Sequence, residues 1–434
     1  MGNKAHIETL AIHGGQAPDP VTKARGLPVW RTTAYNFDSA EHGSNLFALK
    51  ELGFIYTRLG DPTGQILENR LALLEGGAAA VVTASGTAAI HYTALSLAKA
   101  GDEIVAAKNL YGGTYTMFSV LLKDQGITVK FVDALKLDEV RAAITDKTRF
   151  VYAETVGNPA LDVVDVAGLA KAAHERGIPL VIDSTFTPPV NYRPIEDGAD
   201  IVIHSLSKWI GGHGSGIGGA VIDSGTFDWK KSNVPLMTEP DPAYHGLKWA
   251  SDLPAPLAPI AFALRFRTGP LRNLGACLSP DNSWIFLQGL ETLHLRMERH
   301  NANGLAVATW LSKHPKVSWV RYPGLAGDAG HSVAKRQFGD RFGGMVVFGI
   351  KAEGTKSGRE RGRAFIDSLE LFSNLANVGD AKSLAIHPAS TTHSQLTDAE
   401  QLAAGLPPEL VRLSIGLEHI EDILADLEQA LAKA

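Results

Sequence analysis

A single lysine, Lys208, stands in the stretch HSLSKWIGGHGSG, which spans residues 204–216. The stretch follows the apolar run ADIVI at residues 199–203, which has the length of a buried strand. A lone lysine in a turn usually carries only a solvated charge. The alternative is that serines and glycines surround Lys208 because its amine has to approach a bound molecule closely.

Polar residues also follow other apolar runs, at the point where each run ends. They are Ser85, Gly86, Thr87, Tyr111, Glu154, Asn158, Asp183, Thr185, Ser205 and Ser207. Ligands of an open parallel sheet bind beyond the carboxyl ends of its strands, so one crevice is expected to collect these side chains. Ser85 and Gly86 begin a helical pattern, and the free N–H groups of a helix start favour a phosphate group.

Each of these residues also has an ordinary structural explanation when it is considered alone. Taken alone, Asp183 is more often a helix cap or a turn residue, and Tyr111 is more often a core residue. The set as a whole matches the needs of an aldehyde cofactor with a phosphate group. Such a cofactor requires a lysine for the aldehyde, an acid that keeps the pyridine nitrogen protonated and an aromatic ring that stacks on it. The set therefore predicts pyridoxal phosphate.

The elements that must position these residues are strands that alternate with helices. Apolar runs of strand length lie at residues 80–83, 103–107, 128–133, 149–154, 179–184, 200–205 and 219–224. Helical patterns separate several of these runs, at residues 64–77, 86–101, 137–144 and 166–177. This alternation predicts an α/β fold with a mostly parallel central sheet and helices on both faces.

The regular alternation covers only the middle of the chain. We predict an N-terminal arm at residues 1–63, a cofactor-binding domain at 64–280 with an inserted loop near 225–265, and a C-terminal α+β domain at 281–434. The insert is rich in Pro, Trp and charged residues. A long helical stretch at residues 282–314 is expected to begin the C-terminal domain, and a helix at residues 421–432 to end it.

Composition excludes several classes of partner. The chain has 434 residues and a net charge of −5, which argues against nucleic acid or an anionic membrane surface. No apolar run reaches the length of a membrane span. The single cysteine, Cys277, favours a reducing compartment, and we expect a cytoplasmic protein. The histidines His204, His213, His387 and His393 lack metal-ligand spacing, so no metal site is expected.

Over nearly its whole length the chain resembles the Cys/Met-metabolism family of pyridoxal-phosphate-dependent enzymes. The resemblance implies a fold type I transferase in which the C-terminal domain is the smaller one. The motifs that carry it lie at residues 56–77, 84–90, 109–115, 154–159, 181–189, 204–214, 278–280, 287–303, 379–393 and 411–418.

The resemblance assigns a role to each candidate residue. Lys208 would bond the cofactor and move protons, Tyr111 would stack on the ring, and Asp183 would pair with the ring nitrogen. The remaining cofactor contacts would be Ser85, Gly86, Thr87, Asn158, Thr185, Ser205 and Ser207. The substrate contacts would be Arg412, Asn158 and Ser383, with the Arg412 guanidinium group on a carboxylate. Tyr56 and Arg58 would reach the phosphate group of a neighbouring subunit.

The resemblance also implies a reaction and an assembly. It is strongest to the branch that converts O-acetylhomoserine and sulfide to homocysteine and acetate in methionine biosynthesis. Lys382 stands where relatives that handle cystathionine have a glutamate, so we expect sulfide to be preferred over cysteine. Shared active sites imply a dimer, and two such dimers a homotetramer. The alternatives are a cystathionine γ-synthase, a methionine γ-lyase type of enzyme, or a non-catalytic nucleotide-binding or scaffold protein.

Overall fold

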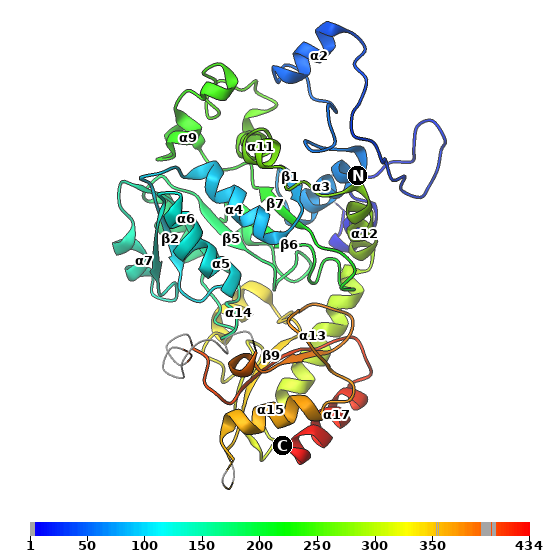
Figure 1. Cartoon of the computed structure of the whole chain (residues 1–434), viewed down its shortest axis with the longest axis vertical. Coiled ribbons are helices and arrows are strands. Elements are labelled where there is room, and N and C mark those ends of the chain that lie inside the picture. Colours follow the sequence, from blue (N-terminus) through cyan, green and yellow to red (C-terminus); the bar gives the residue numbers. More distant parts are fainter. Residues whose placement is uncertain (1–4, 353, 355, 392–400, 402–404) are drawn as a thin grey trace.

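The structure is a computed structural model that describes residues 5–352, 354, 356–391, 401 and 405–434. The described residues form two sheets, and Figure 1 shows the first in the upper half of the molecule and the second in the lower half. Helices surround both sheets, and the long helix α13 (Leu293–Leu311) runs from the region of the first sheet toward the second.

The first sheet has the mostly parallel character that the sequence predicts. Its strand order is β1-β7-β6-β5-β4-β2-β3, and only β7 is antiparallel to its neighbours in the order. All seven residues of β4 are buried, because the sheet is covered on both faces. The strands are β1 (Ala79–Thr83), β2 (Glu103–Ala107), β3 (Thr128–Val132), β4 (Thr148–Glu154), β5 (Leu180–Asp183), β6 (Ile201–Ser205) and β7 (Gly219–Asp223).

The predicted helices of this part are confirmed as α3 (Pro62–Glu75), α4 (Gly86–Leu97), α7 (Leu137–Ala143) and α8 (Val166–His174). Local sequence sets their ends: Asp61 caps α3 by accepting the N–H of Gly64, and Gly76 ends the helix in the left-handed region. The sequence reading missed a further helical segment, which opens on two glycines. It consists of α5 (Gly112–Thr116), the π-helical turn η1 (Met117–Leu121) and α6 (Leu122–Asp124).

The N-terminal arm contains α1 (Ile7–His13) and α2 (Ala40–Phe47). Leu10 and Ala11 of α1 are buried, and α1 packs against α3. In contrast, α2 projects from the body of the molecule at the top of Figure 1. The arm therefore has an anchored beginning and a projecting middle.

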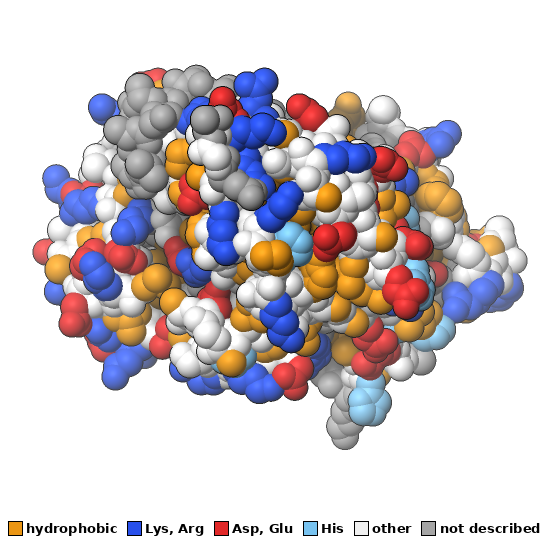
Figure 2. All heavy atoms as spheres, turned by 90° about the horizontal axis from the view of Figure 1, so that it is seen from below, with side chains coloured by type: hydrophobic (Ala, Val, Ile, Leu, Met, Phe, Trp, Pro, Cys, Tyr) orange, Lys and Arg blue, Asp and Glu red, His pale blue; other side chains and the backbone are white. Residues whose placement is uncertain are grey.

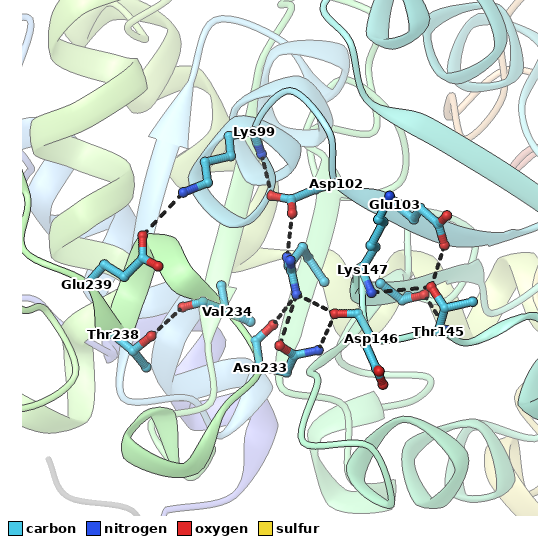
Figure 3. Close-up of polar contacts among 12 residues, drawn as sticks. Lys99, Asp102, Glu103, Thr145, Asp146, Lys147, Asn233, Val234, Thr238 and Glu239 are labelled. Atoms are coloured by element: carbon cyan, nitrogen blue, oxygen red, sulfur yellow. Dashed lines mark hydrogen bonds and ion pairs between the residues drawn. The ribbon is translucent and has the colours of Figure 1, made fainter.

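The insert near residues 225–265 contains short helices where a single loop was predicted. They are η3 (Trp229–Lys231), α9 (Pro235–Thr238), η4 (Pro242–Tyr244), η5 (Ala258–Ile260) and the beginning of α10 (Ala261–Phe266). Arg149 of β4 binds this segment to the sheet, because its Nη1 donates to both oxygens of Asn233 at 3.0 and 3.1 Å while its Nε donates to Asp102 at 2.7 Å. Figure 3 shows Asp102, Asp146 and Asn233 converging on this point.

The second sheet has the order β10-β11-β12-β9-β8. Its strands are β8 (Val317–Arg321), β9 (Met345–Ile350), β10 (Ser373–Asn374), β11 (Leu384–Ile386) and β12 (Leu410–Ser414). The remaining helical segments are η2 (Pro194–Asp197), η6 (Arg267–Leu271), α11 (Arg272–Leu274), α12 (Pro280–Glu291), α14 (His331–Phe338), α15 (Gly358–Ser368), η7 (Pro388–Ser390) and α17 (Ile420–Lys433). The long helix predicted at 282–314 is divided at Thr292 into α12 and α13.

The surface at this lower end of the molecule carries mixed charge. Figure 2 shows Lys and Arg side chains interspersed with Asp and Glu, with hydrophobic side chains between them. A nucleic-acid-binding face carries a continuous basic patch instead. Within the described part of the chain, no helix is both long and apolar enough to cross a membrane.

Candidate active site

A cavity of about 400 Å³ lies at the carboxyl ends of β4, β5 and β6 and extends to the second sheet. The sequence predicted that one crevice would collect the polar residues that follow the strands, and the cavity does so. The predicted site residues that line it are Ser85, Gly86, Thr87, Tyr111, Asn158, Asp183, Thr185, Ser205, Ser207, Lys208 and Arg412.

One end of the cavity is the start of α4. Ser85 caps this helix, and its Oγ accepts the N–H of Ala88 at 3.0 Å, while the first N–H groups of a helix have no partner within it. A Cβ atom at Gly86 would lie 2.8 Å from the Cβ of Ser205, so glycine is needed for the helix start to approach β6. Hydroxyl and backbone N–H groups therefore surround this end, as a phosphate group requires.

The acid of the cavity is Asp183, the last residue of β5. Its Oδ1 accepts the backbone N–H of Thr185 at 2.9 Å, and the hydroxyl group of Tyr152 lies 3.4 Å from its Oδ2. Burial raises the pKa of Asp183, and hydrogen bonds from Thr185 oppose that rise. A buried carboxyl group of this kind is stabilised as an anion by a protonated ring nitrogen beside it.

The amine of Lys208 points toward a residue of the C-terminal half of the chain. Its Nζ donates to Oδ1 of Asn377 at 2.5 Å. Burial lowers the pKa of Lys208, and the nearby charge of Arg412 lowers it further. A lysine that acts as a base near neutral pH requires such a lowered pKa.

Asn377 was missed by the sequence reading, although the motif that begins at Gly379 was noticed. Gly379 has a φ of +77°, and a Cβ atom there would lie 2.6 Å from the backbone nitrogen of Trp209 and 2.9 Å from the carbonyl carbon of Lys208. A glycine at this position therefore lets the segment that carries Asn377 contact the Lys208 turn directly. The last two residues of the 379–393 motif lie outside the described residues.

Arg412 of β12 brings a guanidinium group to the cavity. Its Nη1 donates to Oδ1 of Asn158 at 2.9 Å, and Asn158 precedes a cis peptide bond to Pro159. Burial lowers the pKa of Arg412 to about 10, so the group remains a cation at neutral pH. The two sheets thus meet at the cavity, since Asn158 follows β4 of the first sheet and Arg412 belongs to the second.

Three of the predicted residues do not line this cavity. Ser383 is fully buried, and its hydroxyl group donates to Glu418 Oε2 and accepts the N–H of Gly416, both at 2.9 Å. The hydroxyl group of Ser383 therefore has partners within the chain, and its predicted contact with the substrate stays a prediction. Tyr56 and Arg58 are exposed on the arm, with the Arg58 guanidinium carbon 5.2 Å from the Tyr56 ring centre. Their contact with another subunit stays a prediction.

Lys382 also lies outside the cavity. Its side chain is exposed, and its backbone N–H donates to Asp380 at 3.0 Å. Within one chain, the charge of Lys382 therefore gives no basis for the expected preference for sulfide.

The residues of the cavity fit pyridoxal phosphate by the chemistry of their donors and acceptors. The helix start and the Ser and Thr hydroxyl groups suit its phosphate group, and Asp183 suits its ring nitrogen. Lys208 suits its aldehyde group. The sequence model of the family described as "Cys/Met metabolism PLP-dependent enzyme" matches residues 8–432. The chain belongs to this family.

Several members of this Cys/Met metabolism family are similar to the chain over its full length. An O-acetyl-L-homoserine sulfhydrylase of Leptospira meyeri is 53% identical over 98% of this chain and 96% of its own. A homocysteine synthase of Schizosaccharomyces pombe is 48% identical over 99% of both chains. The crystal structure of a putative O-acetylhomoserine (thiol)-lyase from Campylobacter jejuni, which contains a pyridoxyl-lysine monophosphate, superposes with a TM-score of 0.93 at 39% identity and covers 99% of this chain and 100% of its own.

Proposed function

We propose that this chain is an O-acetylhomoserine sulfhydrylase, which forms homocysteine and acetate from O-acetylhomoserine and sulfide in methionine biosynthesis. The observation that carries the proposal is a cavity that joins Lys208, Asp183 and Arg412 in a chain whose full-length relatives bear that name. When bound, pyridoxal phosphate supplies an electron sink for the bonds at the substrate Cα.

The residues of the chain divide the remaining work. Arg412 binds the substrate carboxylate, and Asn158 orients the guanidinium group by accepting one of its N–H groups. Lys208 removes the proton from the substrate Cα and moves protons at Cβ, which its lowered pKa favours. In the net reaction the C–O bond at Cγ breaks, acetate leaves with the electron pair, and hydrosulfide forms a C–S bond at the same carbon.

The charge of the cavity supports a neutral acyl group on the substrate. Among the described residues that line it, only Lys208 and Arg412 are cationic. Both have roles in the reaction, at the proton transfers and at the carboxylate. A succinyl or phospho group would bring a further negative charge, for which the cavity of one chain offers no additional cation.

We also propose how the subunits assemble and in which cellular compartment the protein works. Tyr56 and Arg58 lie outside the cavity of their own chain, and the arm exposes the apolar side chains of Phe37, Phe47 and Leu52. These features support a dimer in which each arm completes the cavity of the other subunit. We extend the proposal to a homotetramer made of two such dimers. The single Cys277 supports a reducing compartment, the cytoplasm.

The test is a substrate panel that combines O-acetyl-, O-succinyl- and O-phosphohomoserine with sulfide or cysteine. We expect O-acetylhomoserine and sulfide to be the best pair, with homocysteine as the product measured by chromatography. Mainly cystathionine would identify a cystathionine γ-synthase, and release of ammonia and a keto acid would identify a γ-lyase. Lys208→Ala should abolish turnover and the visible absorbance that the lysine-bonded cofactor gives; a protein that is colourless with every cofactor addition would support a non-catalytic role.

A further inference from the structure

A second buried acid, Glu154, lines the same cavity and has no part in the steps described above. It is the last residue of β4 and is paired in register with Asp183 at the end of β5. Only 7% of its surface is exposed. A buried carboxyl group costs free energy unless its oxygens accept hydrogen bonds, so its partners indicate its role.

The partners of Glu154 are backbone groups of two different loops. Its Oε1 accepts the N–H of Tyr111 at 2.7 Å. The backbone N–H of Asn158 also interacts with the carboxyl group. The first loop follows β2 and carries the ring that faces the cofactor, and the second follows β4 and carries the amide that holds Arg412.

Tyr111 depends on this backbone contact for its position. The residue is 53% exposed, so packing within the chain covers less than half of it. It precedes α5, a helix of only five residues, and makes no side-chain cap to it. A Cβ atom at Gly113 would lie 2.6 Å from Cε1 of the Tyr111 ring, so the ring lies directly over the loop backbone. The direction of the ring therefore follows the direction of the backbone that Glu154 holds.

We propose that Glu154 is a positioning residue: its carboxyl group joins the Tyr111 loop to the Asn158 loop and so aligns the stacking ring with the Asn158–Arg412 pair. This inference rests on the proposed function for two roles only, the stacking of the Tyr111 ring and the binding of the substrate carboxylate by Arg412. The group acts through its acceptor oxygens and does not need a negative charge.

The surroundings of Glu154 agree with a role that needs acceptors rather than charge. Burial raises the pKa of Glu154, and the neighbouring carboxylate of Asp183 raises it further. The groups that face it are the carboxyl group of Asp183, the hydroxyl group of Tyr152 and the backbone N–H groups of Tyr111 and Asn158. A protonated Glu154 still accepts hydrogen bonds, and the negative charge then remains on Asp183, where a protonated ring nitrogen requires it.

Two substitutions of similar size separate the acceptor from the charge. Glu154→Gln keeps an oxygen that can accept the N–H of Tyr111, whereas Glu154→Met removes it. The first measurement is hydrogen–deuterium exchange of peptides that cover residues 108–116 and 155–161 in the cofactor-free protein. We expect Glu154→Met to accelerate exchange in both segments and Glu154→Gln to keep residues 108–116, which contain the Tyr111 N–H, near wild type.

Kinetics give the second measurement. In the holoenzyme, Glu154→Met should lower kcat by about tenfold or more and raise KM for the amino-acid substrate, because a displacement of about 1 Å at a site costs rate of this order or more. Glu154→Gln should keep kcat/KM within about threefold of wild type, since the hydrogen-bonded contact persists. The visible circular dichroism of the bound cofactor should change only in Glu154→Met.

The control is Glu103→Met, at the start of β2 and the opposite edge of the sheet, where the carboxylate binds Lys130 at 2.6 Å. It should leave exchange of both loops unchanged. Unchanged exchange in Glu154→Met overturns the proposal, and so does a tenfold loss in Glu154→Gln with both loops still protected. If Glu154→Met does not fold, Glu154→Ala, which also removes the acceptor oxygens, replaces it with the same expected and contradicting results. A wild-type enzyme that forms no homocysteine contradicts the proposed function but leaves the exchange comparison valid.

Discussion

At the scale of single residues, the pKa and the direction of the Lys208 amine depend on its surroundings in space more than on its sequence neighbours. The amine is partly buried, lies near the cation Arg412 and donates to Asn377. Burial and Arg412 both disfavour the ammonium form, while the amide oxygen of Asn377 favours it and also fixes the direction of the amine. Asn377 therefore fixes the position of the Lys208 amine and partly offsets the lowering of its pKa by burial and Arg412.

We predict that Asn377→Ala lowers kcat by on the order of tenfold, a fraction of what a well-placed proton-transfer group contributes. Loss of the amide oxygen removes a partner of the ammonium form, so the pKa of Lys208 should fall further. The acidic limb of the kcat profile should then move to lower pH, because the free base exists at lower pH. The measurement is a pH–rate profile, and Asn374→Ala, at an exposed position of β10, is the control. A profile with an unmoved acidic limb would contradict the argument.

At the scale of elements, the contact between the Gly379 turn and the Lys208 turn decides where Asn377 lies. Gly379→Ala should lower thermal stability and kcat together, since a side chain there has both a left-handed backbone and backbone atoms at 2.6–2.9 Å. Strain and overpacking each cost about 1–3 kcal/mol.

The matched control is Gly76→Ala at the end of α3, which has a φ of +78° but open space around the added Cβ. It should lose only the cost of the left-handed backbone, about 1–2 kcal/mol, with kcat retained. Thermal melts and steady-state kinetics of the two variants give the comparison. Equal losses of kcat in both would show that the close approach at Gly379 has no particular role.

The insert near residues 225–265 depends on Arg149, which donates to Asp102 and Asn233. Figure 3 labels both of these acceptors. Arg149→Ala should destabilise the protein by about 3–5 kcal/mol, because it leaves the buried Asp102 without its cation. Limited proteolysis should then cut between residues 233 and 260. Lys99→Ala removes an exposed ion pair with Glu239 and should cost less than about 1 kcal/mol. Similar melting temperatures for the two variants would refute the buried contact as the main anchor.

At the scale of the whole molecule, the proposed shared sites make a prediction about mixed assemblies. Arg58→Ala should weaken pyridoxal phosphate binding, since a cation near the phosphate group is lost. Lys208→Ala removes the amine in the other part of the same site. Co-refolded mixtures of the two variants should regain part of the activity, because some subunits then combine an intact arm with an intact cavity. Absence of any regained activity, with mixed dimers demonstrated by mass spectrometry, would count against a site that Arg58 completes across the interface.

The sequence by itself determined where the strands and helices of the first sheet lie along the chain and which residues stand at the strand ends. Parallel strands are buried on both faces, so they appear as continuous apolar runs, and their carboxyl ends lie at one edge. Lys208, Asp183 and the start of α4 could therefore be placed together, and the cofactor predicted, before any contact was known. No helical pattern in the sequence indicated α5, because its first residues are glycines.

Only the tertiary structure showed that Asn377 lines the cavity and that Arg412 meets Asn158 there. Asn377 lies 169 residues from Lys208, and Arg412 lies 254 residues from Asn158. Ser383 is close to Asn377 in sequence, but its buried hydroxyl group binds Glu418 and does not line the cavity. The backbone partners of Glu154 were equally invisible. Periodicity indicates which face of an element is buried, but contacts between distant loops depend on how the two sheets pack together.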